Sequence, residues 1–251
     1  MVAFDPDGSH PPVMILGCGR SGTSIFGELF ECVGDYTYMS EPSFDAVATT
    51  DFARPVAFKV PKESAPYPAD PGLSFPLNVL QSKAPNMKYF WIVRHPLDAI
   101  SSLRVGIANN WGHHPRPPDW RSWLDRPIIE QCAYHWTFLN SVGFGRVQQL
   151  AIVMRFEDLI HNPREFASTV CHALGINPDT QASRLKAWAR RVQNTNNHDF
   201  VEAQTSRAYS RPDHSVRVGR WHENLSSDDV AAVAPIIANA ARSFGYDLPR
   251  V

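Results

Sequence analysis

Apolar residues along this chain fall into two kinds of pattern. Short unbroken runs are typical of strands buried on both faces, and apolar positions that recur every three or four residues indicate amphipathic helices. The runs predict strands at 13–17, 56–60, 89–94 and 150–155. The recurring positions predict helices at 23–32, 75–84, 96–105, 128–144, 164–174, 180–192 and 226–244. This alternation predicts an α/β fold with a central parallel sheet flanked by helices on both faces.

The turn between the first strand and the first helix, residues 17–24, reads Gly-Cys-Gly-Arg-Ser-Gly-Thr-Ser. Glycines let the backbone curl tightly around an anion, and free N–H groups at the start of a helix supply partial positive charge. The forked guanidinium of Arg20 and the neighbouring hydroxyls suit a tetrahedral, highly charged group. This turn therefore predicts a phosphate or sulfate site.

Two other kinds of nucleotide loop share part of this pattern. The glycine spacing over 17–22 is that of a nucleotide-triphosphatase loop, but Thr23 stands where that loop has its lysine. The same glycines fit the dinucleotide fingerprint G-x-G-x-x-G, and Glu41 lies near the distance expected for a ribose-binding acid. A proline-rich stretch over 61–76 follows, where the dinucleotide fold has further βα units.

A second candidate anion site follows the strand at 89–94, which ends in Arg94. Ligands of open α/β sheets collect at the carboxyl ends of strands, which is where Arg94 is expected. Ser102 lies eight residues further on, about two helical turns, so its hydroxyl can face the same anion. The alternative is that Arg94 simply pairs with Asp98 and that Ser102 is an ordinary polar helix residue.

Together these motifs resemble those of the sulfotransferases that use 3′-phosphoadenosine 5′-phosphosulfate (PAPS). The 5′-phosphosulfate loop of that family commonly reads [RK]-S-G-T-[ST], as residues 20–24 do, and R-x-P-x-D-x-x-x-S over 94–102 resembles its 3′-phosphate motif. The longer similarity over 20–42 is to carbohydrate 6-O-sulfotransferases and tyrosylprotein sulfotransferases. The resemblance implies a three-layer, P-loop-like sulfotransferase fold in a single domain over 1–251, with a tail at 1–12.

The resemblance further implies transfer of a sulfuryl group from PAPS to an acceptor hydroxyl, with carbohydrate or glycolipid favoured, release of PAP, and no metal. An NAD(P)-binding oxidoreductase and a non-catalytic phosphonucleotide-binding protein remain the alternatives. A C-terminal segment at 214–221 resembles a third family element, which closes over the 3′-phosphate and adenine. The implied cofactor-binding residues are Gly19, Arg20, Ser21, Gly22, Thr23, Ser24, Arg94, Ser102, Ser215, Arg217 and Gly219.

The implied catalytic residues are Glu41, Lys59 and Arg20. The spacing from Arg20 to Glu41 resembles that between the loop and the catalytic glutamate of the tyrosylprotein enzymes, so Glu41 is expected to be the general base. Lys59 ends a strand and is expected to stabilise the leaving phosphate, unless it is an exposed surface lysine. The cytosolic enzymes carry a catalytic histidine just after this lysine, and no histidine stands there in this chain. Glu63 or a histidine of a loop is the alternative base.

Two stretches do not fit packed elements, residues 106–127 and 193–216. Loops of this length in a compact domain are usually functional or disordered. The first holds Trp111, Trp120 and Trp123. We expect it to help form the acceptor site, unless these tryptophans anchor the loop to the core, and we expect the second to form a lid. The adjacent His113 and His114 lack metal-ligand spacing and are expected in a polar loop that contacts the acceptor.

Composition narrows the class of protein further. A net charge of −1 over 251 residues argues against a surface that coats nucleic acid. The 4 cysteines show no paired spacing, which fits reduced thiols inside a cell. With neither a signal peptide nor an apolar run of membrane-spanning length in the sequence, we expect a soluble, cytoplasmic protein. The sequence does not predict the oligomeric state.

Overall fold

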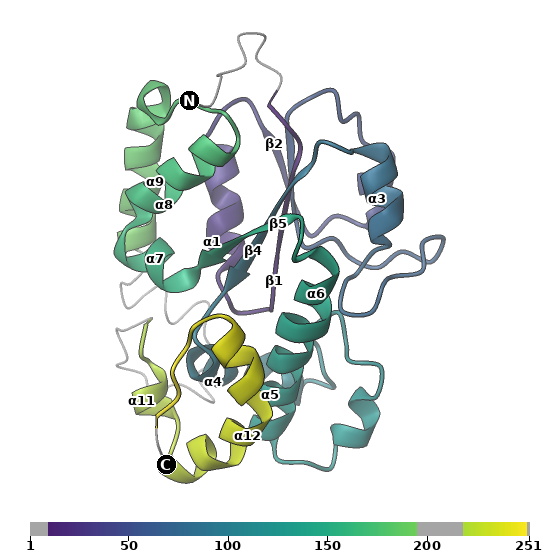
Figure 1. Ribbon diagram of the computed structural model, residues 1–251, viewed down its shortest axis with the longest axis vertical. Coiled ribbons are helices and arrows are strands. Elements are labelled where there is room, and N and C mark those ends of the chain that lie inside the picture. Colours follow the sequence, from purple (N-terminus) through teal and green to yellow (C-terminus); the bar gives the residue numbers. More distant parts are fainter. Residues whose placement is uncertain (1–9, 195–217, 250–251) are drawn as a thin grey trace.

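The computed structural model describes residues 10–194 and 218–249. Its five-stranded sheet is parallel throughout, with the strand order β2-β3-β1-β4-β5. The strands are β1 (Val13–Gly17), β2 (Thr37–Ser40), β3 (Val56–Lys59), β4 (Lys88–Val93) and β5 (Ala151–Arg155). Helices cover both faces (Figure 1), which confirms the predicted α/β architecture with a central parallel sheet.

Side chains alternate along the central strands and fill two separate cores. In β1, Val13 and Ile15 face one core while Met14 and Leu16 face the other. This period of two is what a strand buried on both faces requires. The two cores are therefore the two spaces between the sheet and its helical layers.

The first helical layer consists of α1 (Thr23–Gly27), the 3₁₀ turn η1 (Glu28–Glu31), α7 (Phe156–His161), α8 (Pro163–Ala173), the 3₁₀ turn η4 (Pro178–Gln181) and α9 (Ala182–Asn194). The opposite layer consists of α2 (Phe44–Ala48), α3 (Leu77–Lys83), α4 (Pro96–Ala108), the 3₁₀ turn η2 (Trp120–Trp123), α5 (Ile128–Phe138), α6 (Phe144–Val147), α11 (Trp221–Asn224) and α12 (Ser227–Ser243). In Figure 1 these layers lie on either side of the strands.

The sequence pattern missed β2 and misjudged two helices. β2 is a short edge strand that is partly exposed, so it lacks the unbroken apolar run of a buried strand. The helix expected at 23–32 is α for only Thr23–Gly27 and then tightens into a 3₁₀ turn. The helix expected at 128–144 widens into a π-helical segment, η3 (Leu139–Gly143), before α6. Gly143 packs there against Gly72, closely enough that a Cβ on Gly72 would lie 2.5 Å from the Gly143 nitrogen.

The two predicted long loops fare differently. The stretch 106–127 is shorter than expected, because α4 runs on to Ala108 and η2 forms within the remainder. Of the stretch 193–216, only the last two residues of α9 belong to the described part of the chain, so the predicted lid lies outside it. Of the predicted tail at 1–12, only residues 10–12 are described.

Candidate active site

The carboxyl ends of the parallel strands bring the candidate residues to one edge of the sheet. β1 pairs Ile15 with Lys59 of β3, and β2 pairs Ser40 with the same lysine. Glu41 follows β2 directly, and its backbone N–H donates to the Lys59 carbonyl over 2.9 Å. The glycine-rich loop begins at the end of β1, so the predicted base, lysine and anion loop meet at the edge where α/β folds bind ligands.

The glycine-rich loop needs glycine at both ends for steric reasons. Gly17 has φ +150°, and a Cβ there would lie 2.4 Å from the Ile92 carbonyl oxygen. Gly22 has φ +93°, and a Cβ there would lie 2.4 Å from the ring of Phe156. Within the loop, Ser21 is fully buried and its Oγ has no hydrogen-bond partner among residues 10–194 and 218–249. An unsatisfied buried hydroxyl in an anion loop is the group that a bound oxyanion would satisfy.

The two predicted anion motifs form one continuous cluster. Arg20 Nε donates to Ser102 Oγ over 3.0 Å, and Arg94 Nη1 donates to the Arg20 carbonyl over 3.0 Å. The Arg94 guanidinium also stacks on Phe156 at 4.3 Å from the ring centroid. Burial lowers the pKa of the Arg94 guanidinium, and the nearby Arg20 lowers it further. The structure thus brings together the residues that the sequence assigned to separate anion sites.

Asp98 does not pair simply with Arg94, which was the alternative from the sequence. Its fully buried carboxylate accepts hydrogen bonds from the backbone N–H groups of Gly219 and Trp221 over 2.7 and 2.9 Å. These contacts dock the C-terminal element onto the start of α4. The predicted cofactor residue Gly219 therefore lies in this cluster, while Ser215 and Arg217 lie outside the described residues.

Docking of the C-terminal element adds a third arginine to the cluster, Arg220. Burial lowers the pKa of Arg220 to about 10, and the neighbouring Arg94 and Arg20 contribute to the shift. Arg94 and Arg220 are buried and Arg20 is half-buried, burial lowers the pKa of all three, and Asp98 offsets only part of the shift at Arg94 and Arg220. This much positive charge is costly to hold together unless further anions compensate it. The residues present therefore fit a ligand with more than one anionic group, as a 3′-phosphorylated adenosine phosphosulfate has.

Lys59 and Glu41 form a short ion pair beside the loop. Lys59 Nζ donates to Glu41 Oε1 over 2.6 Å and to Ser24 Oγ over 3.1 Å. The Lys59 side chain is only 5% exposed, so the alternative of a surface lysine is wrong, whereas the Glu41 side chain is 47% exposed. The hydrogen bond from Lys59 is the main cause that lowers the pKa of Glu41. The carboxylate is consequently ionised at neutral pH and able to accept a proton.

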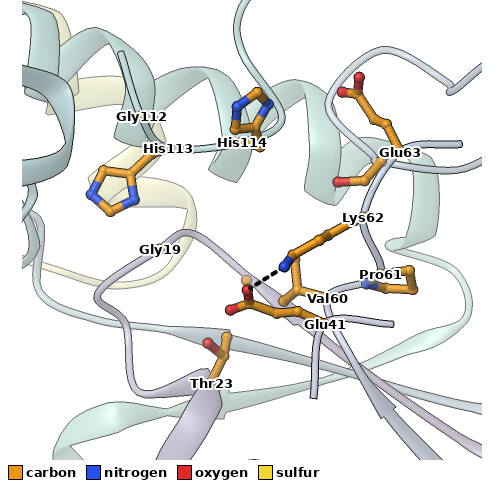
Figure 2. A pocket seen from close by; sticks show the side chains of 12 residues that line it. Gly19, Thr23, Glu41, Val60, Pro61, Lys62, Glu63, Gly112, His113 and His114 are labelled. Atoms are coloured by element: carbon orange, nitrogen blue, oxygen red, sulfur yellow. Dashed lines mark ion pairs between the residues drawn. The ribbon is translucent and has the colours of Figure 1, made fainter. Parts of the chain in front are cut away.

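A cavity of about 480 Å³ opens beside Glu41, and Figure 2 shows the residues that line it. It is lined by Gly17, Gly19, Thr23, Glu41, Val60, Pro61, Lys62, Glu63, Ser74, Gly112, His113 and His114. Lys62 Nζ lies 3.8 Å from Glu41 Oε2 at the wall of this cavity. The backbone of its wall is strained, because Glu41 and Val60 have φ values of +52° and +37° without being glycine. Most of the lining side chains are polar, and none is aromatic apart from the two imidazoles.

The tryptophans of the 106–127 stretch are not among the residues that line this cavity. Trp111 is fully buried and Trp120 nearly so, and both pack in the core under α4 and α5. Trp123 stacks on Tyr134 with ring centroids 4.0 Å apart. These rings hold the loop to the core, which was the alternative from the sequence, and the role of the 106–127 stretch at the acceptor site stays a prediction. The part of the loop that reaches the cavity is Gly112 to His114.

Two features of the site escaped the sequence reasoning. His113 was expected in a loop that contacts the acceptor, but no sequence pattern indicated that its ring lies beside Gly19 of the anion loop. Glu157 accepts hydrogen bonds from the His95 backbone N–H over 2.8 Å and from the Tyr246 hydroxyl over 2.7 Å. This carboxylate fixes the start of α4 behind Arg94. Residues 155–159, Arg-Phe-Glu-Asp-Leu, resemble a segment of the sulfotransferase family. That resemblance could have indicated Glu157, but not its hydrogen-bond partners.

Among residues 10–194 and 218–249, no group of three or more His, Cys, Asp and Glu side chains is arranged to hold a metal ion. Within the same part of the chain, none of the helices combines the length and the apolar character needed to cross a membrane.

Comparison with known proteins gives a consistent family. The family model described as the sulfotransferase domain matches residues 10–245, whereas no curated protein matches the chain. The sulfotransferase domain of a Synechococcus olefin synthase superposes with a TM-score of 0.57 at 16% identity, covering 97% of this chain and 98% of its own.

Two structures determined with PAP show the same fold. A mouse sulfotransferase has a TM-score of 0.54 at 12% identity and covers 92% of this chain and 85% of its own. A retinol dehydratase in complex with androsterone and PAP has a TM-score of 0.55 at 12% identity, covering 95% and 82%. Identities this low establish a common fold.

Proposed function

Since this chain belongs to the sulfotransferase family, we propose that it transfers a sulfuryl group from PAPS to a hydroxyl group of an acceptor and releases PAP. The observation that carries this proposal is the cluster of Arg20, Arg94 and Arg220 around the glycine-rich loop. PAPS has a 3′-phosphate in addition to its phosphosulfate, which NAD and ATP lack, so it needs two anion sites close together. The PAP complexes of the mouse enzyme and of retinol dehydratase support this choice of donor.

The arrangement divides donor binding between two groups of residues. We assign the phosphosulfate to the loop residues Gly19 to Ser24, whose backbone curls around the anion and whose Ser21 hydroxyl lacks a protein partner. We assign the 3′-phosphate to Arg94 and Ser102, with Gly219 and its neighbours closing over it. Arg20 connects the two groups, because it donates to Ser102 from within the loop.

The catalytic step needs a proton acceptor on the acceptor side and positive charge on the leaving side. Sulfuryl transfer forms a bond from the acceptor oxygen to sulfur and breaks the bond from sulfur to the phosphate oxygen. Glu41 receives the hydroxyl proton, because its carboxylate is ionised at neutral pH; Lys59 lowers its pKa, so its strength as a base depends on Lys59 turning to the leaving phosphate when the donor is bound. Lys59, 3.1 Å from Ser24 Oγ, is placed to stabilise the charge that develops on the leaving phosphate. Proximity and charge placement then supply the catalysis.

We propose an acceptor rich in hydroxyl groups, such as a carbohydrate or glycolipid, and the resemblance over 20–42 is the main support for this choice. The charged Lys62 and Glu63 and the imidazole of His114 line the cavity and could form hydrogen bonds with such an acceptor. We further propose that Gly112 to His114, in the 106–127 stretch, contact the acceptor.

Calorimetric titration with PAP, with NAD and ATP as controls, tests the donor. We expect PAP to bind most tightly, and labelled PAPS offered with a panel of sugars, glycolipids, phenols and sterols should then identify the acceptor. Preference for NAD or ATP would overturn the proposal in favour of another nucleotide protein. PAP binding without transfer to any acceptor, and without any effect of Glu41 on slow PAPS hydrolysis, would indicate a non-catalytic binding protein.

A further inference from the structure

The imidazole of His113 is held in a slot between the glycine-rich loop and α4. A Cβ on Gly19 would lie 3.0 Å from His113 Nδ1, and a Cβ on Gly106 would lie 2.3 Å from His113 Nε2. The ring fits only because both neighbours are glycine. One nitrogen thus faces the anion loop while the other faces a helix. Figure 2 shows the ring beside Gly19, at the end of the cavity away from Glu63.

The charges around this ring keep it neutral while the loop holds no anion. Burial lowers the pKa of His113 to about 4, with Arg20 of the loop as the next cause and His114 of the same segment acting in the same direction. The backbone of Leu103 in α4 and the carboxylate of Glu41 after β2 oppose this shift. From α5, His135 is fully buried, its ring centroid lies 5.9 Å from that of His113, and its own pKa is lowered by burial.

An anion bound in the loop would place negative charge beside the ring, where Arg20 now contributes positive charge. Arg20, the charged neighbour that most disfavours the imidazolium, belongs to the loop itself and would be neutralised by a bound phosphosulfate. Nδ1 faces that same loop at Gly19. A protonated ring there would gain a charge-assisted hydrogen bond to an oxygen of the anion, whereas a neutral ring that presents a lone pair would repel it.

We propose that His113 is a further donor-binding residue: when the anion occupies the loop, the imidazole takes up one proton from solvent and Nδ1–H donates to the anion across Gly19. This inference rests on the proposed function, because it requires a phosphosulfate or phosphate in the loop. The protonated imidazole adds one positive charge to those of the arginines, and it does so only when the anion is bound. It also implies that the nucleotide binds more tightly as the pH falls towards 6.

Proton uptake on nucleotide binding tests the proposal directly. PAP is titrated calorimetrically at pH 6.0 to 8.0 in buffers with different ionisation enthalpies, using the native chain, His113→Asn and His114→Asn. Asparagine keeps a polar group near the position of Nδ1 but does not titrate. His114 lines the same cavity, so His114→Asn is the matched control. Because the PAP 5′-phosphate itself titrates near pH 6, the readout is the difference between the variants.

We expect the native chain to take up about 0.5 to 1 more proton than His113→Asn near pH 6, and to gain up to about tenfold more affinity per pH unit as the pH is lowered. The His114→Asn control should still take up the proton, because His113 is intact and loss of His114, which lowers the pKa of His113, can only make protonation easier. Equal uptake and equal pH dependence in all three proteins would overturn the role of His113 while leaving PAP binding intact. Failure of the native chain to bind PAP would overturn the proposed function and this inference together.

A second measurement observes the protonation state of the imidazole directly in the native chain, and uses a variant only to assign the signal. In the native chain labelled with ¹⁵N on histidine, the Nδ1 and Nε2 shifts of one buried imidazole should change from the neutral to the charged pattern when PAP is added at pH 6.5. Resonances that stay neutral at saturating PAP would exclude proton uptake by His113. Assignment through His113→Asn spectra completes the test.

Discussion

The two sides of the active site are built on opposite principles. On the donor side, Arg94, Asp98 and Arg220 are almost completely buried, and hydrogen bonds hold Arg94 and Asp98 in place. On the acceptor side, the Glu41 and Lys62 side chains are 47% and 67% exposed. Buried charges need fixed partners, which makes the donor side pre-organised, whereas exposed charges are screened and adjustable. We infer from this difference that buried, fixed charges recognise the donor, whereas exposed side chains that can adjust their positions recognise the acceptor.

The sharpest way to separate the two sides is Glu41→Gln. This variant removes the proposed base but keeps its size, so we expect kcat to fall by about 10²- to 10⁴-fold. The PAP dissociation constant, measured by calorimetry, should change by less than about twofold, because Glu41 lies on the acceptor side. Retained turnover would mean that another group of the cavity, such as Glu63, removes the proton.

The converse change is Arg94→Ala, which should weaken the binding of PAP rather than slow the transfer step. Loss of a buried charge-assisted contact is expected to raise the PAP dissociation constant by about 10- to 100-fold. Lys62→Ala is the matched control, since it deletes an exposed positive charge near the same cavity and should change PAP affinity by less than about threefold. Equal losses in both variants would show that only net charge matters and that the buried frame has no special role.

A subtler test of the donor frame is Asp98→Asn. The amide leaves one oxygen to accept where two backbone N–H groups now donate, at Gly219 and Trp221. We expect a loss of about 1–3 kcal/mol in stability, measured by urea unfolding, and a PAP affinity weaker by about tenfold. If the affinity were unchanged while the stability fell, the C-terminal element would not contribute to the donor site.

The smallest expected effect is on the pH dependence of stability without nucleotide. The pKa of His113 is lowered to about 4 in the folded chain, below its usual value of 6.5. Between those values the unfolded chain binds more protons, so stability is present above pH 6.5 and is lost as the pH falls towards 4. We expect about 1–2 kcal/mol between pH 7 and 5 from this residue. Urea unfolding should show a shallower pH dependence for His113→Asn, and identical slopes would contradict the buried neutral ring.

The sequence predicted four of the five strands because each is an unbroken apolar run; β1, β3 and β4 are buried in the middle of the sheet, and the edge strand β5 keeps the apolar run although Val153 is exposed. β2 was missed because Tyr38 and Met39 are only partly buried at the edge of the sheet, so its pattern carries little signal. The motifs also predicted Arg20, Lys59 and Arg94 as residues of one site, because the carboxyl ends of parallel strands lie at the same edge of a sheet. The docking of Gly219 on Asp98 joins residues 121 positions apart, and no local pattern indicates such a contact.

The same reasoning explains why the acceptor side could be predicted only in outline. The 106–127 stretch was expected at the acceptor site, but Trp111 and Trp120 pack inward, and only Gly112 to His114 reach the cavity. The slot of His113 depends on two glycines, at 19 and 106, that come from different elements. Their spacing in the sequence is unrelated to their distance in space, so the slot becomes evident only in the fold.

The left-handed backbone at Arg20, Glu41 and Val60 has a consequence for laboratory evolution. Each such residue costs on the order of 1–3 kcal/mol that glycine would largely avoid. A library selected only for survival of heating would therefore enrich glycine at these positions, and those at 20 and 41 would abolish the donor contact and the proposed base. A library selected for turnover would retain the strained residues. Selection for heat tolerance and selection for turnover would thus favour different residues at positions 20 and 41.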